Sequence, residues 1–214
     1  MEMDKKKFII PTIAAVLTLI LLTAGATYAY FSVSTTNSFG TTTIEATADT
    51  VGSVALTGGS NLTLHVTAEQ MMQGANDITY YASASGTTTT ETSPVIATAT
   101  VTGSGTYNCN YTLNIAASAT SAANNMYTKF QNMSTMSTGQ IVLTVGGTAY
   151  DFNTASLFPM TINGTLTAVS SGSPKTVTAQ LKLVNKASIN QDDLQGTDIT
   201  LTFTATAFTC TATA

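Results

Sequence analysis

From about residue 40 to the C-terminus, apolar and polar side chains alternate along most of the chain. In residues 199–207 the odd positions are apolar and most even positions are threonine, and residues 176–183 and 107–115 follow the same period of two. Successive side chains of a β-strand point to opposite faces, so the pattern predicts strands that bury one face and expose a polar one. Weaker runs bring the expected total to about nine or ten short strands; they cover residues 41–48, 51–57, 61–67, 77–84, 94–102 and 140–145.

Turn signals separate these runs. Gly58-Gly59 and residues 103–105 supply positions that tolerate positive φ, while Gly146-Gly147 and Asn163-Gly164 are typical of two-residue hairpin loops. This spacing predicts an all-β antiparallel sandwich or jelly roll that forms one domain over residues 40–214.

Helical spacing is limited to the connections between the strands. We expect one or two short helices, over residues 68–73 and 120–132, and a further turn over residues 188–195 that ends at Gly196. In the second helix, Met126, Phe130 and Met133 fall on one face.

Composition narrows the possible partners. Charged residues make up 8% of the chain and hydrophobic residues 43%, so self-repulsion does not favour disorder. There is no arginine, and after residue 29 four lysines stand against nine acidic residues. Binding to phosphates requires clustered cations, so this balance argues against nucleic acid as a partner.

The first 29 residues have the organisation of an export signal. Lysines at 5–7 precede an apolar run from Phe8 that is long enough, at about 24 residues, to span a bilayer. Ala24-Gly25-Ala26 and Thr27-Tyr28-Ala29 are both small-x-small patterns, and Pro11 weakens the run as a permanent span. We expect a signal peptide that is cleaved at one of these two registers, with membrane contact only before cleavage by a signal peptidase; an uncleaved anchor is the alternative.

The two cysteines, Cys109 and Cys210, both follow the leader. In an oxidising exterior we expect them to form one disulfide, with free thiols or an intermolecular bridge as alternatives. Cys210 has the opposite parity to the apolar face that ends at Ala207. Either a bulge near Phe208 returns Cys210 to the core, or this disulfide does not form.

Residues 30–39 carry the weakest strand pattern. Small polar residues dominate them, although Tyr30, Phe31, Val33 and Phe39 offer apolar surface for one side of an extended arm. Such an arm, beside a sheet with a vacant edge, is suited to strand addition between subunits. The alternative is a frayed terminus or a linker.

Several stretches resemble a known family. The junction at residues 25–31, Gly-Ala-Thr-Tyr-Ala-Tyr-Phe, is similar to signal peptides processed by the SipW class of signal peptidase. Residues 183–186, 194–196 and 199–207 resemble the closing strands of the TasA and camelysin family. This chain is poorer in lysine and glutamate than the fibre proteins of that family, and it has a cysteine pair that they generally lack.

The resemblance carries functional expectations. Members of the family are secreted jelly-roll proteins, several of which polymerise into biofilm-matrix fibres in which the N-terminal segment of one subunit completes the sheet of the next. It therefore implies cleavage between Ala29 and Tyr30 and a donor segment over residues 30–39.

Groups able to perform catalysis are scarce. Some relatives carry a metallo-endopeptidase label, but a zinc peptidase needs two histidines in a His-Glu-x-x-His pattern, and this chain has only His65, on the polar side of a strand pattern. It has no Gly-x-Ser-x-Gly motif for a nucleophilic serine. We therefore expect no enzyme activity, no cofactor and no metal.

Two weaker signals remain. Asn190, Asp192, Asp193 and Asp198 are oxygen-rich but do not have EF-hand spacing, so capping and turn roles compete with Ca²⁺ binding. Asn-x-Ser/Thr sequons occur by chance in a chain this rich in threonine; they lie at Asn61, Asn110, Asn132 and Asn163.

Together these observations predict a structural protein of the cell surface or extracellular matrix that assembles with copies of itself. The alternative is a monomeric, membrane-tethered surface or adhesive module.

Overall fold

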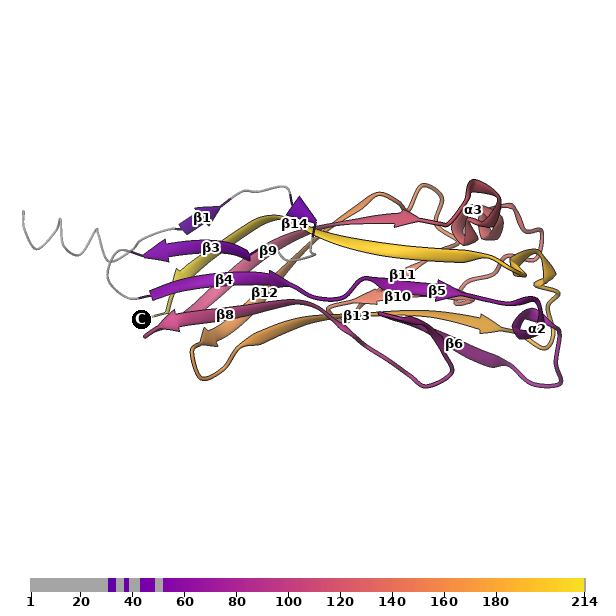
Figure 1. Cartoon of the computed structure of the whole chain (residues 1–214), viewed down its shortest axis with the longest axis horizontal. Helices are drawn as coiled ribbons and strands as arrows, with labels where there is room; N and C mark the ends of the chain where they lie inside the picture. The colour runs from indigo at the N-terminus through magenta and orange to yellow at the C-terminus, as the bar shows by residue number, and fades with distance from the viewer. Residues whose placement is uncertain (1–30, 34–36, 39–42, 49–51, 214) are drawn as a thin grey trace, which may run out of the picture.

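The computed structural model describes residues 31–33, 37–38, 43–48 and 52–213. Within them, fourteen strands form antiparallel pairings, and two α-helices and two 3-10 turns lie in connections (Figure 1). The all-β prediction is confirmed. The strands are β1 (Phe31–Val33), β2 (Asn37–Ser38), β3 (Thr43–Ala48), β4 (Gly52–Gly58), β5 (Leu62–His65), β6 (Ile78–Ser83), β7 (Gly86–Thr88), β8 (Val95–Gly103), β9 (Thr106–Ser118), β10 (Ile141–Val145), β11 (Thr148–Asp151), β12 (Met160–Ser170), β13 (Lys175–Asn185) and β14 (Asp198–Ala212). The helical elements are α2 (Ala68–Met71), η1 (Ala122–Asn124), α3 (Met126–Asn132) and η2 (Asp192–Leu194).

The strands pack as two layers over much of their length. In one layer β9 lies between β12 and β14, and in the other β8 lies between β13 and β4, with β3 beyond β4. β12 contacts β8 and β13, and β14 contacts β3 and β4, without pairing with them, as expected when two sheets pack face to face. The strands follow the long axis of the molecule, and α2 and α3 lie at the end opposite to the C-terminus (Figure 1).

The alternation in the sequence becomes the inner and outer faces of these layers. Along β13, Val177, Ala179, Leu181 and Leu183 are buried, while the residues between them are only half-buried. The single buried cluster also takes in Phe130 of α3, whose face was predicted from helical spacing. Burial of one apolar face per strand is therefore the main source of stability.

The predicted helix over residues 120–132 is divided in two. η1 ends before Asn125, and the side chain of Asn125 accepts a hydrogen bond of 3.0 Å from the backbone N–H of Thr128, which caps α3. An extended residue with a side-chain acceptor is a typical N-cap, so helix α3 begins anew at Met126.

Of the two predicted hairpin loops, one is confirmed and one is wrong. Gly146 and Gly147 have φ of 55° and 87° and join β10 to β11. Asn163-Gly164, in contrast, lies inside β12, where Gly164 faces Tyr111 of β9. A Cβ on Gly164 would lie 2.2 Å from the Tyr111 hydroxyl oxygen. The glycine is thus required by the tyrosine ring above it, and no turn is involved.

Candidate functional site: the edge of strand β14

Strand β14 is paired differently on its two sides. On one side β9 accompanies it through twelve residue pairs. On the other side β5 pairs with residues 198–201, and among the described residues the short strands β2 and β1 pair with residues 204–205 and 208–210. The candidate site is this edge of β14, from residue 204 to residue 210.

The predicted N-terminal arm supplies the strands that cover this edge. In β1, Phe31 pairs with Cys210 and Val33 pairs with Phe208, and in β2, Ser38 pairs with Thr204. β1 lies at the same end of the molecule as the C-terminus (Figure 1). The arm of this chain therefore occupies an edge of its own sheet. The predicted cleavage residues Ala29 and Tyr30, and the donor candidate Phe39, lie outside the described residues.

A β-bulge in the middle of β14 resolves the parity of Cys210. Ala205 faces Leu113 while Ala207 faces Thr112, so β14 accommodates one additional residue, Thr206. The bulge shifts the buried face from odd to even positions, as predicted for one of the two alternatives.

The disulfide closes β14 onto β9 at the same place. Cys109 and Cys210 face each other in register, are both 1% exposed, and are joined by a disulfide whose ends are 101 residues apart in sequence. The predicted pairing is confirmed, and such a bond is consistent with an oxidising, extracellular type of compartment. Because β1 pairs with residues 208–210, the covalent link lies directly beside the covered edge.

The residues that the sequence analysis considered for metal binding or catalysis form hydrogen bonds within the fold. His65 is exposed at the end of β5, where its backbone N–H donates to the hydroxyl of Thr87 at 2.8 Å. Asp198, by contrast, is buried, and its two oxygens accept from the backbone N–H and the hydroxyl of Thr120 at 2.8 and 2.7 Å. Among the described residues, no group of three or more His, Cys, Asp or Glu side chains is placed to hold a metal ion.

Asn190 and Asp192 of the proposed Ca²⁺ loop also have local roles. One Asp192 carboxylate oxygen accepts from the side-chain amide of Gln195 at 2.9 Å, and the Asn190 side chain accepts from the backbone N–H of Asp192 at 2.8 Å. These contacts fit the capping and turn interpretation of the segment.

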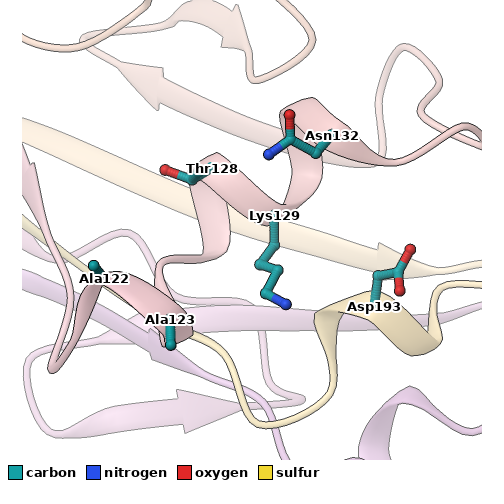
Figure 2. A pocket seen from close by; sticks show the side chains of 6 residues that line it. All are labelled: Ala122, Ala123, Thr128, Lys129, Asn132 and Asp193. Atoms are coloured by element: carbon teal, nitrogen blue, oxygen red, sulfur yellow. The ribbon is translucent and has the colours of Figure 1, made fainter.

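A shallow hollow lies between α3, η1 and η2, where no sequence pattern predicted one. It measures about 340 Å³, and Lys129 extends from α3 into the space between the two turns, with Asp193 at its side (Figure 2). Its lining residues are Ala122, Ala123, Thr128, Lys129, Asn132 and Asp193, all exposed. The lining combines one ammonium with one carboxylate and contains no nucleophile paired with a base.

Two further properties are the potential of the chain's helices to span a membrane and its similarity to known proteins. In the part of the chain that the structure describes, no helix has the length and apolar character needed to cross a membrane. No family model, curated protein or solved structure matches the chain.

Proposed function

We propose that this chain is an exported structural protein that polymerises into extracellular fibres by exchanging its N-terminal arm. Residues 30–38 of one copy would pair with the edge of β14 of the next copy, in place of that copy's own arm. The observation that carries the proposal is the pairing of β2 and β1 with residues 204–205 and 208–210, because no other described strand pairs with these residues on this side of β14.

Exchange of this kind would preserve the pairing of both arm strands. β1 pairs through three residues and β2 through two, and an arm from a second copy would make the same pairs. When identical segments exchange between copies, each residue pair inside one chain is replaced by the same pair between two chains. The exchange itself therefore costs little, and the balance between monomer and polymer depends on protein concentration.

The edge of β14 from residue 204 to residue 210, which would accept the arm, is held in position by other contacts. Pairing with β9 and the Cys109–Cys210 disulfide hold β14 from the other side. The Phe208 side chain, which is completely buried, holds the same segment in the core. β14 would therefore present a fixed edge to either arm.

Export is the second part of the proposal. The leader pattern and the disulfide both favour an oxidising exterior, where the cell surface or matrix is the expected location. Low charge also suits self-assembly, because identical subunits repel one another through their net charge.

A reversible, engineered disulfide between the arm and β14 tests the exchange. Ser38 and Thr204 are paired in register, so a Ser38→Cys/Thr204→Cys variant of the chain starting at Tyr30 can form a disulfide between arm and acceptor. If the variant is oxidised while monomeric, each arm is locked onto its own β14, and electron microscopy should show no filaments until a mild reductant opens the engineered bond. If it is oxidised after assembly, denaturing gels should show a ladder of covalent multimers.

The control is the Thr204→Cys variant, which has no partner in the arm and should assemble without forming a ladder. Only intrachain bonds under all conditions, with no filaments from the unmodified chain, would refute the proposal and favour the membrane-tethered monomer.

A further inference from the structure

Strand β12 is long and, among the residues that the structure describes, pairs with another strand on one side only. It runs for eleven residues and pairs with β9. Its other contacts are with β8 and β13, which lie across the sandwich. Among the described residues, none forms a strand along its outer edge. An edge of this kind presents unpaired backbone N–H and C=O groups, which can pair with another strand.

Most of this edge lacks the features that usually prevent such pairing. Residues 160–170 contain no charged residue and no proline. The register of β12 shifts between Leu166 and Val169, and Ala168 has a φ of 54°, so a bulge interrupts the C-terminal third of the strand. The segment from Met160 to Leu166 is therefore the open part of the edge.

Apart from the pair that Ile162 would form with Gly164, this segment matches itself when it is reversed. In an antiparallel pairing centred on residue 163, Asn163 faces its own copy, residue 161 faces residue 165, and residue 160 faces residue 166. Thr161, Asn163 and Thr165 are exposed on the outer face, so polar residues meet polar residues. On the inner face, the half-buried Met160 would meet Leu166. A two-fold axis requires this self-complementarity.

The position of the edge is compatible with arm exchange. Within one layer the order is β12, β9 and β14, with β1 and β2 beyond β14, so the open edge and the arm lie on opposite sides of that layer. Both contacts can therefore be made by one subunit at the same time. Two identical chains repel through any like charges they bring together, and a neutral segment avoids this cost.

We propose that residues 160–166 of β12 pair with the same residues of a second copy about a two-fold axis, joining the two sheets into one. This inference rests on the proposed self-assembly and adds a lateral contact to it: arm exchange would make a filament, and β12 pairing would join two filaments side by side.

Cross-linking with a short bismaleimide tests the register, because the native cysteines are joined in a disulfide and do not react. Residues directly opposite in an antiparallel pair have Cα atoms about 4.5–5.5 Å apart, so Asn163→Cys should link to itself across the axis. Thr161→Cys is the matched control. Residue 161 would face residue 165 of the other copy, four residues along the strand from that copy's residue 161, so the two copies of residue 161 would be about 13 Å apart. It should link to Thr165→Cys in a mixture but only weakly to itself.

A charge at the edge provides a second test that does not depend on the engineered cysteines. Thr165→Lys brings a lysine into the pairing, whereas Thr100→Lys places the same charge on the exposed face of β8, which is paired on both sides. Thr165→Lys should weaken lateral association by at least about tenfold in sedimentation experiments while leaving the melting temperature unchanged, and Thr100→Lys should not weaken it.

The outcomes separate the two proposals. Single filaments without cross-linking at Asn163 would overturn the β12 contact and leave arm exchange intact. Cross-linked dimers without filaments would support the β12 contact and refute arm exchange. Equal cross-linking at positions 161 and 163, or equal effects of the two lysine variants, would also overturn the proposed register.

Discussion

The packing of Tyr111 over Gly164 gives a direct test of the fold, because a single methyl group should disturb it. In Gly164→Ala the new Cβ would lie 2.2 Å from the Tyr111 hydroxyl oxygen, 2.3 Å from Cζ and 2.7 Å from Cε1. The ring has little room to move away, since Tyr111 is only 7% exposed. Overpacking of this kind costs about 1–3 kcal/mol, which corresponds to about 2–4 °C in melting temperature for each kcal/mol in a domain of this size.

Equilibrium unfolding in urea, monitored by circular dichroism, would measure this cost. Gly172→Ala is the control, because a Cβ there has no neighbour within 4 Å, and it should be neutral or slightly stabilising. A double-mutant cycle with Tyr111→Ala identifies the cause: once the ring is gone, Gly164→Ala should cost little more than Gly172→Ala. If Gly164→Ala costs as much without the ring as with it, the collision with Tyr111 is not the reason for the glycine.

Three further predictions concern stability. Replacing Cys109 and Cys210 with alanine should lower the free energy of unfolding by about 4 kcal/mol, because the bond closes a loop of 101 residues; urea unfolding with and without reductant checks this, and no difference would refute it. Burial raises the pKa of Tyr80 above its usual 10.0, so the stability that comes from its neutral form is complete below pH 10 and is lost as the pH rises through the folded-state pKa; Tyr80→Phe should flatten the alkaline fall in melting temperature. Asp198→Asn should cost about 1.5–3 kcal/mol, since the buried carboxylate accepts two hydrogen bonds, and this cost should shrink in a Thr120→Val background.

Local alternation was enough to predict most of the strands and to give a bulge near Phe208 as one of two alternatives. Leu201, Phe203 and Ala205 are buried at odd positions, and Phe208 and Cys210 are buried at even ones. That change of parity can be read from the sequence, because a disulfide between two core cysteines requires Cys210 to face inward. The position of the additional residue depends on pairing with β9, which no local pattern specifies.

Strand β12 was missed because its centre has the signature of a turn. Asn-Gly favours the positive φ angles of a tight hairpin, and the prediction placed one there. In the structure, Gly164 instead accommodates the ring of Tyr111, a residue 53 positions earlier in the chain. A contact across such a distance overrides the local preference, and it cannot be recognised until the two strands are known to be neighbours.

The edge of β14 could be predicted only in part for the same reason. The weak strand pattern at Phe31 and Val33 indicated an arm in need of a partner, but its register opposite residues 208–210 is set by tertiary pairing. The disulfide beside that edge was predicted from the oxidising context, although the parity of Cys210 argued against it unless a bulge intervened.

The chemistry of this chain favours recognition through its backbone. Most polar side chains of the outer faces are neutral, and some already bond to one another, as Thr112 does to Asn163 and Thr161 to Asn114, each at 2.7 Å. Such side chains offer little to distinguish one ligand from another, whereas a strand edge offers a directional row of donors and acceptors whose register is set by the neighbouring side chains. If the proposed self-assembly holds, alternation and strand length would be the features by which one copy selects another. On this view a charge placed at an edge should disrupt assembly far more than the same charge on a face, which is the difference between Thr165→Lys and Thr100→Lys.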